Sequence, residues 1–209
     1  MGNPTFPDAT LECIGQTLDS AYSCFIEYSK KNANQRADFL RRIADNLEKH
    51  RNSVIETAEE ETSLGLMRLE GECSRTIDQI RLFATFTEKE EWKEISTEVA
   101  EPNRTPIPKP AMYKANHPIG PVVVIGACNF PLAISVVGTD TTSALAVGCP
   151  VVVKSHPRHA QTCQLLADLV NQAKRESNMP DGCFHLVHGE SHGVSTALVS
   201  HPRTSCVAF

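Results

Sequence analysis

Short, wholly apolar segments in the second half of the chain constrain its fold more than any other feature. The first, Val122–Ile125, is apolar at every position, which is typical of a strand covered on both faces rather than one that faces water on alternate positions. Val151–Val153 and Cys206–Phe209 share this character, and Cys183–Val187 does so except at His185. These segments predict the strands of a buried, parallel sheet.

Longer segments with helical spacing separate the strands, at about residues 131–147, 159–176 and 194–200. Strands that alternate with helices predict a doubly wound α/β fold, since right-handed crossovers place helices on both faces of a parallel sheet. Because the sequence stops within the last apolar segment, we expect this Rossmann-like sheet to be incomplete.

The first half of the chain has a different pattern. Apolar residues recur at helical spacing from Leu11 to Trp92, with charged positions such as Glu59, Glu60 and Glu61 expected on solvated helix faces. Six prolines then lie in residues 101–121, where each removes a backbone donor and disfavours helix. We therefore expect a helical N-terminal segment (1–100), a proline-rich linker or edge hairpin (101–121) and a partial dinucleotide-binding domain (122–209).

Composition and charge exclude several classes of partner. The 209 residues carry a formal net charge of -5, which offers no broad cationic face to nucleic acid or to anionic lipid. No apolar run approaches the roughly 20 residues of a membrane span, and no basic and then hydrophobic leader begins the chain. We expect a cytoplasmic protein that binds neither nucleic acid nor membranes.

The turn after the first strand is the first candidate site. Residues 122–131 predict a strand, a tight turn and a helix start, which would bring backbone to the carboxyl edge of the sheet, where open α/β folds bind ligands. This is not the glycine-rich dinucleotide fingerprint, and the single Gly126 could simply serve the turn. The pattern alone leaves both interpretations open.

Two longer motifs point to a particular protein family. Residues 120–132 read GPVVVIGACNFPL and residues 143–154 read SALAVGCPVVVK, and together they resemble the aldehyde dehydrogenase superfamily. The upstream segments ETSL (61–64), RLEGE (68–72) and PKP (108–110) are similar to the NADP-linked branch that contains fatty-aldehyde and 2-oxoglutarate-semialdehyde (2,5-dioxovalerate) dehydrogenases. The likeness runs from about Leu11 to Phe209 and covers the N-terminal portion of that family.

The resemblance implies a reaction. Such enzymes oxidise an aldehyde or semialdehyde to a carboxylic acid through a cysteine thiohemiacetal, and the resemblance places that cysteine and its general base beyond this chain. Asn129 would donate a side-chain N–H to the developing oxyanion. Without the family, Asn129 before Phe130 and Pro131 would be a good helix N-cap, and the two interpretations are compatible.

The resemblance also implies contacts with an NAD(P) cofactor. Lys154 would hold the adenosine ribose, although a strand-end lysine can also simply reach solvent. Gly189 would permit close approach near the adenine. Backbone contacts would come from the turn after the first strand, at Ile125, Gly126, Ala127 and Cys128.

The residues after Lys154 bear on the choice of cofactor. Many NAD-preferring relatives place a glutamate three positions after this lysine, where its carboxylate repels a 2′-phosphate. Pro157 occupies that position here, and His156 and Arg158 lie beside it. We therefore expect NADP to bind better than NAD; the alternative is that Pro157 only starts the next helix and Arg158 faces solvent.

Two other chemistries are weaker candidates. Cys128 could be an activated thiol at a helix N-terminus, but the resemblance places other residues at this position, so we expect it only to fill the turn. Six histidines lie on separate loops and strands without a helical metal pair, so we expect no metal site: His156, His159, His185, His188, His192 and His201.

Two functions from different classes remain. The first is a fragment of an NAD(P)-dependent aldehyde dehydrogenase, inactive by itself and homo-oligomeric in full-length form. The second is a non-catalytic truncated homologue that pairs with full-length aldehyde dehydrogenase subunits. We favour the first, because nothing in the sequence encodes a new partner surface.

Overall fold

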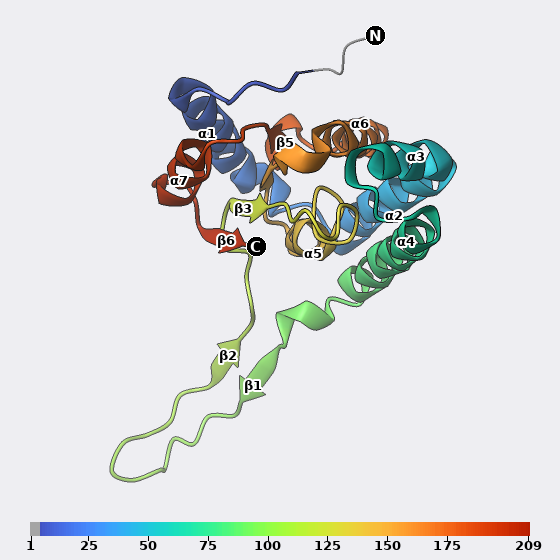
Figure 1. Cartoon of the computed structure of the whole chain (residues 1–209). Coiled ribbons are helices and arrows are strands. Elements are labelled where there is room, and N and C mark those ends of the chain that lie inside the picture. The colour runs from blue at the N-terminus through green and yellow to red at the C-terminus, as the bar shows by residue number, and fades with distance from the viewer. Residues whose placement is uncertain (1–4) are drawn as a thin grey trace.

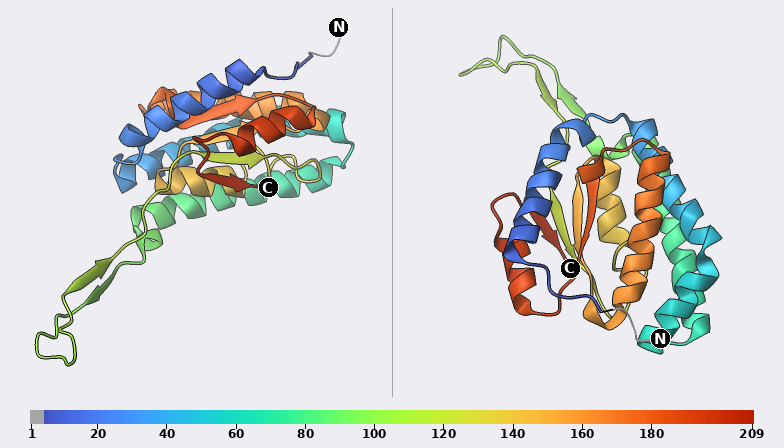
Figure 2. Two further views of the ribbon diagram at one scale, coloured as in Figure 1. Left: turned by 90° about the vertical axis from the view of Figure 1, so that its left-hand side faces the viewer. Right: turned by 90° about the horizontal axis from the view of Figure 1, so that it is seen from above.

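The computed structural model describes residues 5–209 as a layered α/β body from which one hairpin projects (Figure 1). A parallel sheet forms the middle layer, and helices cover both of its faces (Figure 2). The predicted doubly wound fold class is therefore confirmed. The α-helices are α1 (Leu11–Tyr28), α2 (Ala33–Lys49), α3 (Arg51–Thr62), α4 (Leu66–Glu88), α5 (Thr139–Val147), α6 (Ala160–Glu176) and α7 (His192–Ser200).

The central sheet has four strands in the order β5-β4-β3-β6, all parallel. Their bounds are β3 (Val122–Ile125), β4 (Val151–Lys154), β5 (Phe184–Val187) and β6 (Cys206–Ala208). Val122 pairs with Val151 and Ile125 with Lys154, so β3 and β4 end together. This register brings the loops that follow the two strands to one edge.

Alternate residues of the central strands enter two separate cores, as expected for strands covered on both faces. Val122 and Val124 join the larger core, which is shared with α2 to α6. Val123 and Val152 join the smaller one, which they share with Ile14 of α1 and with α7. The first helix of the chain therefore packs on the opposite face of the sheet from the three helices that follow it.

One predicted helix begins too early. We expected a helix over about 131–147, but residues 131–138 form irregular turns and α5 begins only at Thr139. The reason is that the carbonyls needed to propagate a helix are already used: Ala133 accepts from the Thr139 N–H at 3.1 Å, and Ile134 accepts from the Ala127 N–H at 2.9 Å. Only residues 139–147 retain the predicted helical conformation.

The first part of the proline-rich segment lies within an antiparallel hairpin that extends away from the body, and residues 115–121 lead back to β3 (Figures 1 and 2). Its strands are β1 (Ser96–Glu98) and β2 (Met112–Lys114), and an isolated bridge joins Glu101 to Lys109. Several large apolar side chains of this arm are exposed: Ile95, Val99, Ile107, Met112 and Tyr113. In residues 5–209, no helix combines the length and the apolar character that crossing a membrane requires.

Glu61, expected on a solvated helix face, instead joins two helices. Its carboxylate accepts hydrogen bonds from the N–H groups of Gln161 and Thr162, at 2.9 and 2.8 Å, and from the Thr162 hydroxyl. The first N–H groups of α6 have no partner within their own helix, so this carboxylate caps it from a hundred residues away. The cap fixes the start of α6 and, with it, the end of the loop that follows β4.

We predict that Glu61→Ala lowers the free energy of unfolding by about 1–3 kcal/mol, because it leaves partly buried N–H donors without an acceptor. Urea denaturation followed by circular dichroism measures this change. Glu60→Ala is the matched control, since Glu60 is exposed on the same helix. An equal loss of stability in both variants would contradict the capping role.

Candidate functional site

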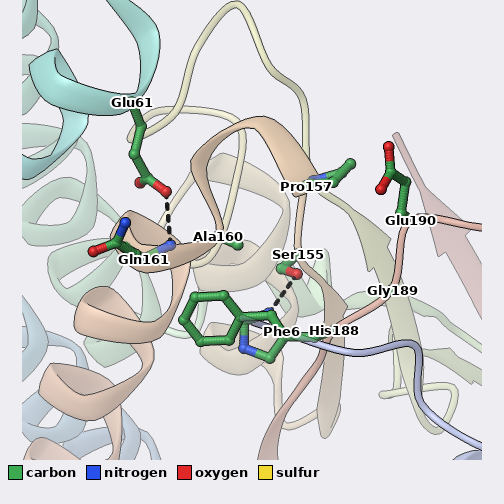
Figure 3. A pocket seen from close by; sticks show the side chains of 9 residues that line it. All are labelled: Phe6, Glu61, Ser155, Pro157, Ala160, Gln161, His188, Gly189 and Glu190. Atoms are coloured by element: carbon green, nitrogen blue, oxygen red, sulfur yellow. Dashed lines mark hydrogen bonds between the residues drawn. The ribbon is translucent and has the colours of Figure 1, made fainter. Parts of the chain in front are cut away.

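A cavity of about 250 Å³ opens at the carboxyl edge of the sheet, where the loops after β4 and β5 meet the start of α6 (Figure 3). This is the edge at which the sequence predicted a ligand site. The residues that line it are Phe6, Glu61, Ser155, Pro157, Ala160, Gln161, His188, Gly189 and Glu190.

Lys154, the last residue of β4, lies directly before this cavity and is 6% exposed. Within residues 5–209 its ammonium group forms no ion pair at 4.0 Å or less. Burial lowers the pKa of Lys154, while the nearby carboxylates of Asp8 and Glu190 act to raise it. A buried cation without an ion-pair partner is costly unless something compensates its charge, so Lys154 is well suited to an anionic or hydroxylated ligand.

Ser155, His188 and Gln164 form a hydrogen-bonded chain behind the cavity. His188 Nε2 lies 3.0 Å from the Gln164 Oε1, which can only accept, so this nitrogen carries the proton. His188 Nδ1 then accepts from the Ser155 hydroxyl at 2.9 Å. The ring of Phe6 stacks on His188 with centroids 4.4 Å apart (Figure 3). The N-terminal segment therefore closes one side of the cavity.

Side chains would be crowded at two glycines, severely at Gly189 and less so at Gly126. A Cβ on Gly189 would lie 2.7 Å from a Val194 methyl, so the loop after β5 passes directly over α7. A Cβ on Gly126 would lie 3.2 Å from the Ser135 hydroxyl and 3.3 Å from the Lys154 carbonyl. The backbone after β3 can therefore stay close to the backbone after β4.

A buried histidine also holds the turn after β3 in place. His159 is fully buried and its Nε2 lies 2.9 Å from the Ala127 carbonyl, which accepts the hydrogen bond. This contact ties the segment of Ile125, Gly126, Ala127 and Cys128 to the start of α6. Sequence spacing gave no sign of it, since the two residues are 32 positions apart.

Asn129 is exposed, and its backbone carbonyl accepts a hydrogen bond from the guanidinium of Arg68 on α4. The N-cap interpretation of Asn129 is wrong, because residues 131–138 form turns and the next helix, α5, begins only at Thr139. The same fact removes the proposed activation of the exposed Cys128 by a helix N-terminus.

Pro157 starts a short 3-10 helix, η2 (Pro157–His159), and Arg158 is exposed. Both features agree with the alternative interpretation, in which Pro157 only starts the next helix and Arg158 faces solvent. His156 Nδ1 accepts from the Arg158 N–H at 3.1 Å, so that nitrogen is already used. Burial, and then His159, lowers the pKa of His156 and favours its neutral form.

Acidic residues at the cavity were missed by sequence reasoning. Asp8 accepts from the N–H groups of Glu190, at 2.6 Å, and Ser191, ahead of α7. Glu190 itself lines the cavity beside Pro157 (Figure 3). No local signal could have found the Asp8 contact, because it spans 182 residues. Among residues 5–209, no group of three potential ligands could hold a metal ion.

Comparison with known proteins gives this site its context. The structure superimposes on glyceraldehyde-3-phosphate dehydrogenase GapN from Methanocaldococcus jannaschii, complexed with NADP, with a TM-score of 0.85, covering 100% of this chain and 43% of that one at 17% identity. An NADP-dependent enzyme of E. coli gives a TM-score of 0.83, covering 96% of this chain and 39% of that one at 23% identity. The chain therefore shares the fold of the matching parts of these two enzymes.

Sequence comparison identifies the family. The profile of the Aldehyde dehydrogenase family matches residues 4–209, and the chain belongs to that family. It is 39% identical to an alpha-ketoglutaric semialdehyde dehydrogenase of Acinetobacter baylyi, over 98% of this chain and 38% of that protein. It is 40% identical to alpha-ketoglutaric semialdehyde dehydrogenase 2 of Azospirillum brasilense, over 99% of this chain and 39% of that protein. The chain thus spans about two fifths of these relatives, in their N-terminal part.

The partly buried imidazole of His188 predicts a pH dependence. Burial lowers the pKa of His188 below its ordinary value of 6.5, so the unfolded chain binds this proton more readily than the folded one. We expect the free energy of unfolding to fall as pH drops from 7.5 to 5, and His188→Gln to flatten that fall. Urea denaturation at several pH values measures the slope. Replacing the exposed His117 with Gln is the control; the same flattening there would contradict the assignment.

Proposed function

We propose that this chain forms the nucleotide-binding part of an NAD(P)+-dependent aldehyde dehydrogenase that oxidises a semialdehyde to a carboxylic acid. The observation that carries this proposal is Lys154 at the carboxyl edge of the sheet, a buried lysine that forms no ion pair with any of residues 5–209, in a chain that belongs to this family. The relatives quoted above act on semialdehydes by name, which supports the substrate class.

The residues present fit such a cofactor. Lys154 would bind the adenosine ribose through its ammonium group, and Gly189, which lines the cavity, would contact the nucleotide through its backbone. The backbone of Ile125, Gly126, Ala127 and Cys128, fixed by His159, would line its path. When bound, the nicotinamide supplies the hydride acceptor.

Asn129 is proposed to stabilise the oxyanion that forms when a thiolate attacks the aldehyde. Arg68 anchors the backbone of Asn129, and the side chain is exposed, so its N–H group is free to point out of the turn towards a substrate. The attacking cysteine and the general base are proposed to lie in the part of the relatives that this chain does not cover. The chain by itself is accordingly expected to be inactive.

A non-catalytic partner of full-length subunits is the second candidate. The exposed apolar side chains of the projecting hairpin favour association, either in a homo-oligomer or with such subunits. Two measurements separate the candidates: aldehyde oxidation by this chain joined to the remaining segment of the Acinetobacter baylyi relative, and pairing of the chain alone with the full-length relative. Pairing without turnover in the joined protein would favour the second candidate.

NADP+ is the proposed cofactor, with NAD+ as an alternative. Pro157 stands where many NAD-preferring relatives have a glutamate, so no carboxylate at that position repels a 2′-phosphate. Lys154 and the exposed Arg158 are the cations proposed to face that phosphate. Glu190 opposes this preference, because its carboxylate lines the same cavity.

In the joined protein we therefore predict that kcat/KM is higher with NADP+ than with NAD+, by about 1–3 kcal/mol in transition-state free energy. Pro157→Glu should shift the ratio towards NAD+, since it adds a carboxylate, and Glu190→Gln should shift it further towards NADP+. Steady-state rates of NAD(P)H formation with both cofactors test this. Equal or better use of NAD+ by the unmutated protein would overturn the preference.

A further inference from the structure

Two arginines of α4 converge on the residue after Asn129. The guanidinium carbons of Arg68 and Arg75 lie 5.0 and 5.3 Å from the centroid of the Phe130 ring. An aromatic ring attracts a cation, but two like charges that share one ring also repel each other. This arrangement is most stable when an anion lies near both guanidinium groups.

Glu72 supplies only part of that charge. One of its carboxylate oxygens accepts from the N–H groups of Leu132 and Ala133, at 2.8 and 2.9 Å. The other lies 3.7 Å from Arg68. Glu72 is therefore used to hold the turn after Asn129 and to balance Arg68.

Arg75 is left without such a partner. It is exposed, and within residues 5–209 it forms no ion pair at 4.0 Å or less. Asp78, one turn further along α4, is the other acidic residue that shares a hollow with Arg75. Arg68 adds a further donor: within residues 5–209 its Nη1 is buried without a hydrogen-bond partner, as is the neighbouring Oε2 of Glu72.

The space around Arg75 suits a short organic anion. A hollow of about 160 Å³ is bounded by Arg68, Gly71, Glu72, Arg75 and Phe130. A second hollow, of about 540 Å³, also includes Arg75 and has an apolar wall of Leu82, Ala133 and Ile134. A carboxylate can meet the arginine while a carbon chain lies along the apolar wall or the Phe130 ring.

We propose that Arg75, assisted by Arg68, binds the carboxylate at the far end of a semialdehyde substrate whose aldehyde group lies at Asn129. This inference rests on the proposed function and adds the residues that select an anionic aldehyde over a neutral one. Arg75 contacts substrate but takes no part in bond making or breaking.

The test is binding to the 209-residue chain, with 5-hydroxypentanoate as the probe. This molecule has the carboxylate and the chain length of a five-carbon semialdehyde, but a hydroxyl replaces the aldehyde. Arginine Nε–Hε resonances are followed by NMR during titration. We expect a saturable shift of the Arg75 resonance, and an affinity that falls at least about 10-fold in Arg75→Gln, the scale of a charge-assisted contact.

Two controls make the result specific. Arg81→Gln removes the same charge from an exposed position on α4 and should change the affinity by less than about 2-fold, as for a surface charge. The neutral 1,5-pentanediol should produce no saturable shift at Arg75. Equal weakening in the two variants, or no carboxylate-dependent shift in the unmutated chain, would overturn the inference. Binding requires no turnover, so the outcome is independent of whether aldehyde oxidation is observed in the joined protein.

Discussion

The parallel pairing of β3 with β4, buried on both faces, is the constraint on which the rest of the structure depends. None of the residues in Val122–Val124 and Val151–Val153 is more than 6% exposed. Strands without a solvated face must be covered by helices on both sides, so α1 and α7 lie on one face and α5 and α6 on the other. The matched ends of β3 and β4 then bring Gly126 and Lys154 together at the edge where the cavity opens.

Carboxylates from distant parts of the chain complete this edge. Glu61 occupies the start of α6, and Asp8 accepts from the N–H groups ahead of α7. Helix N-termini commonly bind phosphate groups, but at the start of α6 the Glu61 carboxylate already occupies the N–H groups of Gln161 and Thr162. In the proposed function, recognition of an anionic ligand at this cavity therefore relies on a side-chain cation, the buried Lys154.

The sequence predicted features that depend on local pattern. Apolar segments located all four parallel strands, and the motifs around Gly126 and Lys154 located the edge that carries the cavity. Features that depend on distant contacts were missed. Residues 131–138 have helical spacing, yet the N–H groups of Thr139 and Ala127 take the Ala133 and Ile134 carbonyls that a helix would use. Glu61 looked like a solvated charge, because nothing near it in sequence reveals Gln161 and Thr162 as its partners.

The central claim is that Lys154 and the cavity beside it bind the cofactor, and nucleotide binding by the 209-residue chain tests it most directly. Isothermal titration with NADP+ should be compared between the unmutated chain, Lys154→Met and Lys114→Met, the last removing an exposed lysine of β2. The account predicts saturable binding that weakens at least about 10-fold in Lys154→Met and is unchanged in Lys114→Met. Equal affinities in all three proteins, or no saturable binding by the unmutated chain, would contradict it.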